Sequence, residues 1–181
     1  CALPIYVGDS YYLSQVARDA KEDLIIFCGV KFMAESAKVL SPEKTVILPA
    51  PNAGCPMADM AEVEDVEEMI EKYPDAFKVC YINSSYEVKA LCDASVTSSS
   101  ALKIIKNIPN KQILFLPDQN LGGYISEFFP EKEFILWRGF CPTHHRITAE
   151  DIIKAKEEHP NVKVLSHPEC SKEVRDRSEE H

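Results

Sequence analysis

Short apolar runs alternate with amphipathic segments along the whole chain, and this alternation constrains the fold more than any other feature. The apolar runs are continuous rather than alternating with polar residues, which is typical of strands buried on both faces of a parallel sheet. They lie at 24–28, 45–48, 78–82, 113–116, 134–137 and 162–165, with a weaker candidate at 95–97.

The segments between these runs have helical periodicity. Pro42, Pro74, Pro109 and Pro160 each follow one of them, where a helix should stop. Strands that alternate with helices predict an α/β fold with short parallel sheets and helices on both faces. The predicted helices lie at 10–20, 32–40, 63–73, 87–92, 101–107 and 149–159.

Composition limits the classes of partner. The chain has 181 residues, of which 45% are hydrophobic, and a formal net charge of −9. This charge argues against nucleic acid or an anionic membrane as the main partner. No apolar run approaches the ~20 residues of a membrane span, and no signal peptide is visible at the start. Any anionic substrate would need local help from helix N-termini or a metal.

The seven cysteines are odd in number and irregularly spaced, which argues against a secreted disulfide framework and favours the cytoplasm. Cys28, Cys80 and Cys92 lie in apolar patterns and are predicted to be core residues. Cys55 and Cys141 instead lie in Cys-Pro loops that follow strands. Such loops suit iron–sulfur ligands, although the two could equally be loop cysteines without a role.

Hydroxyl groups stand at the start of predicted helices at two positions. Ser98 lies in a Thr-Ser-Ser-Ser segment that opens a predicted helix, and Ser10 opens another after Gly8-Asp9. Hydroxyls and free N–H groups at such positions can hold a phosphate. The alternative is simple N-capping, which is the commoner role of these residue types.

Further polar side chains follow predicted strands. Tyr81 and Asn83 lie on the same side of one strand end and could orient a carbonyl or carboxylate; the alternative is a turn-forming Asn at a strand end. His167 and Glu169 could carry out acid–base chemistry, and His144 is a further candidate. Histidines in such positions are also often structural or merely exposed.

The order and separation of several motifs resemble the quinolinate synthase family, the iron–sulfur enzymes of NAD biosynthesis. The motifs include Gly8-Asp9-Ser10, Cys55-Pro56-Met57-Ala58, Tyr81-Ile82-Asn83-Ser84, Cys141-Pro142-Thr143-His144 and His167-Pro168-Glu169-Cys170. The resemblance extends over nearly the whole chain.

This resemblance implies a fold of three α/β/α units with short parallel sheets related by pseudo-threefold symmetry. Residues 1–52 would form a partial first unit, 53–140 the second, and 141–181 the start of an incomplete third. The family condenses iminoaspartate, which L-aspartate oxidase could supply, with dihydroxyacetone phosphate. The products are quinolinate, phosphate and water.

The resemblance also implies roles for individual residues. The family holds a [4Fe–4S] cluster through three cysteines and leaves one iron open as a Lewis acid. Cys55 and Cys141 match the first two ligands. Ser10, Ser98 and Asn83 match substrate-binding residues, and the catalytic residues would be Tyr81, His144, His167 and Glu169. Of these, Glu169 is the best acid–base candidate.

The chain departs from the family pattern at both ends. Neither the His-Asn-Tyr motif of the family's first strand nor the third cluster cysteine is found, and Cys170 does not match that third position. We therefore expect this chain alone to lack useful activity. The alternative function is a non-catalytic α/β domain that keeps the scaffold and binds a phosphosugar or a metal.

Overall fold

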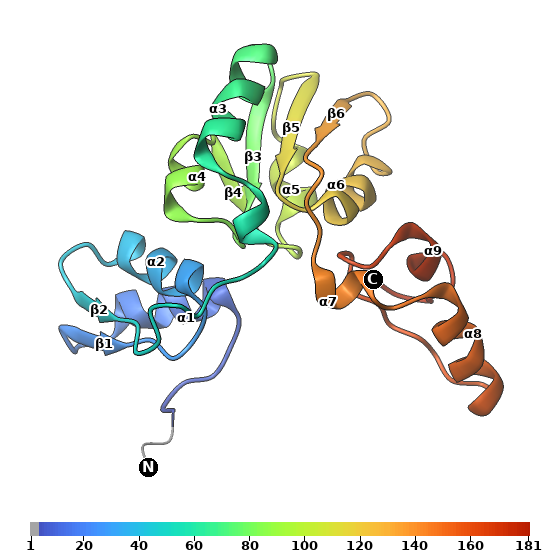
Figure 1. Cartoon of the computed structure of the whole chain (residues 1–181), viewed down its shortest axis with the longest axis horizontal. Helices are drawn as coiled ribbons and strands as arrows, with labels where there is room; N and C mark the ends of the chain where they lie inside the picture. Colours follow the sequence, from blue (N-terminus) through green and yellow to red (C-terminus); the bar gives the residue numbers. More distant parts are fainter. Residues whose placement is uncertain (1–3) are drawn as a thin grey trace.

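The computed structural model describes residues 4–181, which contain two parallel sheets (Figure 1). The first sheet pairs β1 (Leu24–Ile26) with β2 (Thr45–Ile47). The second has the strand order β4-β3-β5-β6, and every pairing in it is parallel. Its strands are β3 (Phe77–Tyr81), β4 (Ala94–Val96), β5 (Gln112–Leu116) and β6 (Glu133–Leu136). These sheets and their intervening helices confirm the α/β prediction.

The helices separate into three groups along the chain (Figure 1). The first group accompanies the small sheet, the second surrounds the large sheet, and the third follows it. The first is α1 (Ser10–Asp19) and α2 (Lys31–Leu40). The second is η1 (Ala58–Met60), α3 (Val63–Lys72), α4 (Tyr86–Ala90), α5 (Ala101–Ile105) and α6 (Gln119–Ser126). The third is α7 (Pro142–His145), α8 (Ala149–Glu158) and α9 (Lys172–Arg175).

Alternate residues of β5 build separate cores on the two faces of the large sheet. Ile113 and Phe115 belong to the cluster that contains buried residues of α5 and α6. Leu114 and Leu116 belong to the cluster that contains buried residues of α3 and α4. Because all four side chains are fully buried, the central strands are covered on both faces. This agrees with their continuous apolar sequence.

The small sheet is buried on one face only. Helices α1 and α2 pack together, and residues of both share a core cluster with Phe27 and Ile25. Leu24, Ile26 and Ile47 are exposed at 52%, 63% and 43%. Within residues 4–181, the prediction of burial on both faces is therefore wrong for β1 and β2. The core assignment of Cys28 is also wrong, since it is exposed beyond the end of β1.

The predicted strand at 162–165 is not formed. This segment makes a single parallel bridge, between Leu165 and Glu180, after a left-handed Asn161 with φ 72°. Leu165 is 70% exposed, so its apolar side chain has no sheet face to bury. Without a neighbouring strand along its length, the segment stays extended but isolated. In residues 4–181, no helix is both long and apolar enough to cross a membrane.

Candidate functional site

A buried carboxylate lies at the centre of a polar cluster beside the large sheet. Cys141 precedes the short helix α7, His144 lies in α7, and Glu169 lies in the loop before α9. Glu169 is only 3% exposed, and its Oε2 lies 2.9 Å from Nδ1 of His144. One ligand atom from each of the three residues lies within 4.8 Å of the others. The fold therefore brings together three predicted site residues that are distant in sequence.

His167 completes the surroundings of this carboxylate. Its Nδ1 lies 3.8 Å from Oε1 of Glu169 and accepts a hydrogen bond of 3.2 Å from the Glu169 backbone N–H. Its ring stacks on that of His144 with centroids 5.0 Å apart. Burial lowers the pKa of His167, and His144 acts in the same direction while Glu169 opposes it. A neutral His167 with an accepting Nδ1 fits these contacts.

Tyr81 reaches the same carboxylate from the end of β3. Tyr81 is buried, with an exposed fraction of 6%. Burial raises the pKa of Tyr81 far above its usual range, and the neighbouring Glu169 carboxylate raises it further. The nearby Ser98 side chain has the opposite effect on this pKa. Tyr81 therefore lies near both Glu169 and Ser98, and its phenol stays protonated.

The two predicted cluster cysteines pack against the same part of the core. Cys55, in the loop after β2, and Cys141 both pack against the hydrophobic cluster that contains Tyr81. Burial raises the pKa of the Cys141 thiol, and backbone N–H groups of His144 and Thr143 oppose this effect. Cys170, which the motif comparison leaves without a ligand role, is fully buried.

The donor set at this cluster suits a metal group. A thiolate, an imidazole and a carboxylate are the protein ligands of most transition metals. Nδ1 of His144 is buried and has no hydrogen bond of normal geometry among the described residues. It faces the Glu169 carboxylate at 2.9 Å, so the two side chains can share one metal ion. The arrangement can therefore hold a metal, and Glu169 can also exchange protons with a ligand.

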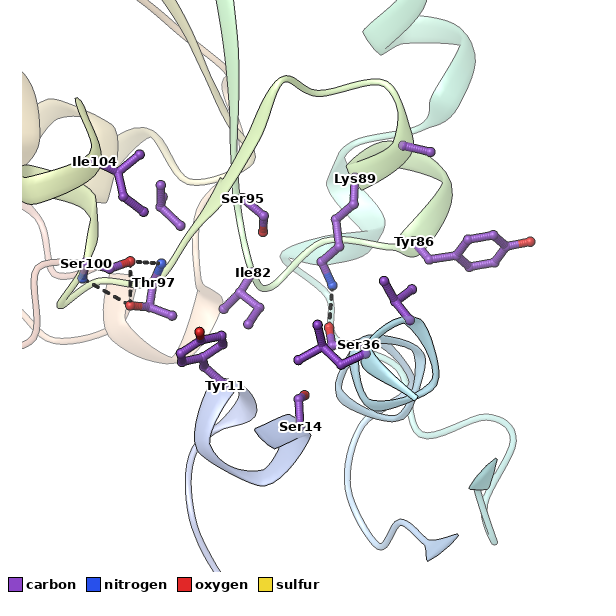
Figure 2. A pocket seen from close by; sticks show the side chains of 14 residues that line it. Tyr11, Ser14, Ser36, Ile82, Tyr86, Lys89, Ser95, Thr97, Ser100 and Ile104 are labelled. Carbon is purple, nitrogen blue, oxygen red and sulfur yellow. Dashed lines mark hydrogen bonds between the residues drawn. The ribbon is translucent and has the colours of Figure 1, made fainter. Parts of the chain in front are cut away.

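A cavity of about 480 Å³ lies between α1 and α2 on one side and α4, β4 and α5 on the other (Figure 2). Tyr11, which follows Ser10, and Thr97, which precedes Ser98, both line it. Lys89 projects into the same space and donates a 2.8 Å hydrogen bond to Oγ of Ser36. The cavity thus has a cationic group and several hydroxyls on mainly apolar walls.

Capping accounts for part of the serine and threonine pattern. Asp9, rather than Ser10, caps α1 by accepting the Tyr12 N–H at 2.8 Å. The hydroxyls of Thr97 and Ser100 hydrogen-bond to each other at 2.9 Å (Figure 2). Ser98 takes no part in that exchange and instead lies beside Tyr81. Asn83 is half-buried in the turn that follows β3.

Two residues near the cluster were not predicted as site residues. Asp118, at the start of α6, accepts the backbone N–H of Cys141, and Asn120 donates to the backbone carbonyl of Glu169. Burial raises the pKa of Asp118 to about 6. The only local signal in the sequence was that Asp often caps helices, and no helix was predicted after Asp118.

Comparisons with known proteins agree with the motifs. A family model described as "Quinolinate synthetase A protein" matches residues 2–181. The chain is 62% identical over 170 residues to a quinolinate synthase of Clostridioides difficile (strain 630), covering 94% of this chain and 56% of the relative.

More distant relatives give the same result. A quinolinate synthase of Clostridium perfringens (strain SM101 / Type A) is 60% identical over 174 residues, which cover 96% of this chain and 58% of the relative. One from Caldicellulosiruptor saccharolyticus is 58% identical over 169 residues, covering 93% and 56% respectively. The chain thus spans a little over half the length of the curated relatives it matches.

Proposed function

Because this chain belongs to the quinolinate synthetase A family, we propose that the protein carrying it condenses iminoaspartate with dihydroxyacetone phosphate to give quinolinate. The observation that best supports the proposal is the buried Glu169 carboxylate, enclosed by two histidines and Tyr81 beside Cys141. Condensation with loss of water and phosphate needs repeated proton transfers, and a carboxylate in this setting is suited to them.

A [4Fe–4S] cluster would be held by the cysteines of the site. Cys55 and Cys141 would supply two of its ligands, and thiolates are the usual protein ligands of such clusters. When bound, the cluster would supply an open iron that polarises substrate oxygen atoms as a Lewis acid. Glu169 and His144 lie next to Cys141 and would face that side of the site.

The remaining residues would orient substrate and move protons. A protonated Tyr81 can donate a hydrogen bond to a carbonyl or carboxylate, and Asn83 lies two residues further along the chain. Neutral His167 would keep Glu169 in place through the backbone contact at 3.2 Å. Glu169 would then take a proton from carbon and return it to a leaving oxygen.

The phosphate of dihydroxyacetone phosphate would lie in or beside the cavity. Ser98 and Ser10 adjoin residues of its opposing walls. Lys89 offers a cationic group there. Among the described residues, no carboxylate lies within ion-pair distance of Lys89. These features favour an anionic substrate despite the acidic net charge of −9.

The decisive test for the acid–base role is Glu169→Gln in the complete gene product that contains this sequence. Gln preserves the size of the side chain but cannot exchange the proton, so kcat should fall by about 10²–10⁴-fold. Glu173→Gln is the control, because this exposed α9 residue lies four positions further on. Quinolinate formation should be followed anaerobically after cluster reconstitution, with L-aspartate oxidase supplying iminoaspartate. Equal rates in the two variants would contradict the assignment.

The same assay should include residues 1–181 alone. The resemblance assigns two of three cluster cysteines to them, so we expect turnover at least about tenfold below that of the complete protein, or ~1.4 kcal/mol of transition-state stabilisation. If both the complete protein and the 181-residue chain stay colourless and inactive under strict anaerobiosis, the result would instead favour the non-catalytic binding domain.

A further inference from the structure

We propose that Asp118 is a positioning residue that fixes Cys141 and Glu169 relative to each other through the start of α6. The proposal rests on the proposed function only in treating these two residues as the working groups of the site. Asp118 itself would touch neither substrate nor cluster, since its carboxylate is fully buried and all of its contacts named below are to backbone groups.

The two oxygens of the Asp118 carboxylate have different partners. Oδ1 accepts the backbone N–H groups of Asn120 and Leu121, both at 2.8 Å, and so caps α6. Oδ2 accepts the backbone N–H of Cys141 at 3.1 Å. A single rigid group therefore joins the first turn of a helix to the loop that presents the thiol. Hydrogen bonds to a buried charged group are among the stronger ones in proteins.

Backbone pairing brings the Cys141 loop to this carboxylate. Beyond β5 and β6, Asp118 and Gly139 form a further parallel bridge, and Gln119 donates its N–H to the Gly139 carbonyl at 2.8 Å. A Cβ at position 139 would lie 2.4 Å from the Pro117 carbonyl oxygen. Only glycine permits so close an approach, so the loop is laid directly along residues 117–119.

The second arm runs from α6 to Glu169. The side-chain amide of Asn120 donates to the Glu169 backbone carbonyl at 3.1 Å. The same helix holds the segment after Glu169, because Arg175 lies over the Tyr124 ring at 5.1 Å and reaches Oε1 of Glu127 at 3.4 Å. Helix α6 thus contacts both segments that carry the polar cluster, and Asp118 connects its first turn to Cys141.

A capping role alone would not require a carboxylate. Ser, Thr or Asn would each provide the oxygen that α6 needs. Only Asp offers a second acceptor that can reach the Cys141 N–H. Asp118→Asn keeps one acceptor for the helix but turns an N–H group towards a buried N–H donor. This variant therefore separates the positioning function from the cap.

The test measures thiol reactivity in the metal-free 181-residue chain, so it does not depend on catalysis. Alkylation of Cys141 and Cys55 by iodoacetamide is followed by peptide mass spectrometry. In Asp118→Asn the loop should open more readily, and Cys141 should react about threefold faster or more, while Cys55 keeps its rate. Asp9→Asn, the same change at the α1 cap, should alter neither rate.

Two outcomes would overturn the proposal. One is a Cys141 rate in Asp118→Asn within about 1.5-fold of the wild-type rate, and the other is an equal increase at Cys55. If the variant does not fold, amide hydrogen exchange in the wild-type chain decides: the Cys141 N–H should be as protected as that of Leu121, and rapid exchange at Cys141 would refute the contact. Failure of the proposed function would leave both measurements unaffected.

Discussion

At the scale of single residues, burial gives the polar groups of this site their properties. Glu169 and Asp118 are both almost inaccessible, at 3% and 0% exposure, yet their partners differ. The first lies among side chains that can exchange protons, and the second is bound to backbone N–H groups. A carboxylate surrounded by titratable groups suits chemistry, whereas one saturated by backbone donors suits positioning.

Tyr81 gives a residue-scale prediction at alkaline pH. Its folded pKa is raised, mainly by burial and then by Glu169, above the value of ~10 for a free tyrosine. Above pH ~10 the unfolded chain therefore loses a proton that the folded chain keeps, and stability falls as pH rises. Between pH 9.5 and 11, Tyr81→Phe should remove about 1 kcal/mol of this decline.

Urea unfolding at the two pH values measures this difference. Tyr12→Phe is the control, because Tyr12 is 48% exposed and is therefore not buried as Tyr81 is. The same pH dependence in wild type and in Tyr81→Phe would show that the phenol titrates normally.

Some residues of the site could be predicted from sequence and others could not. Glu169, His167 and His144 stand in motifs with recognisable chemistry, and the structure brings them together. Asp118 could not be predicted as part of the site, because its link to Cys141 depends on how two chain segments 23 positions apart are laid side by side. Capping propensity is local, and this contact is not.

At the scale of elements, α6 shows how packing overrides helix propensity. Its sequence contains Gly122 and Gly123, which disfavour a helix, and no helix was predicted there. The first glycine is needed for contact with the sheet: a Cβ at position 122 would lie 2.7 Å from side-chain atoms of both Leu136 and Phe115. The opposite error occurred at 162–165. A strand was predicted there from the apolar run, but none forms because the run lacks neighbouring strands.

The two glycines of α6 should respond in opposite ways to alanine. Gly122→Ala should destabilise the chain by about 1–3 kcal/mol, because overpacking outweighs the gain in helix propensity. At position 123 the nearest atom, Cδ1 of Leu136, lies 3.9 Å from the added Cβ. Gly123→Ala should therefore stabilise by up to ~1 kcal/mol. Thermal unfolding of both variants tests the pair, and equal effects would contradict the close packing of α6.

At the scale of the whole molecule, polar contacts between distant segments join the first helices to the large-sheet unit. Glu35 of α2 accepts the Tyr86 N–H at the start of α4 at 3.1 Å. Lys89 of α4 donates to Ser36 at 2.8 Å (Figure 2). The partners are 51 and 53 positions apart. Alternating sequence patterns predict the units, but such contacts depend on their relative placement, which periodicity does not encode.

Lys89 gives the corresponding prediction for this junction. Burial lowers its pKa to about 8, although Cys80 and Glu35 partly oppose the shift. A free lysine has a pKa of ~10.4, so between these values the unfolded chain binds the proton more strongly than the folded chain. Stability should therefore rise across this window as pH increases, by about 1–2 kcal/mol between pH 7.5 and 9.5.

Lys89→Met should abolish this rise, since methionine fills similar space without a charge. The measurement is urea unfolding at both pH values, below the range in which Tyr81 contributes. Lys103→Met, at an exposed position on α5, should keep the wild-type rise. A Lys89→Met chain with the wild-type pH dependence would mean that the ammonium is hydrated rather than buried. The cavity between the two parts of the molecule would then be open to water at Lys89, and the cationic group there would attract an anionic substrate only weakly.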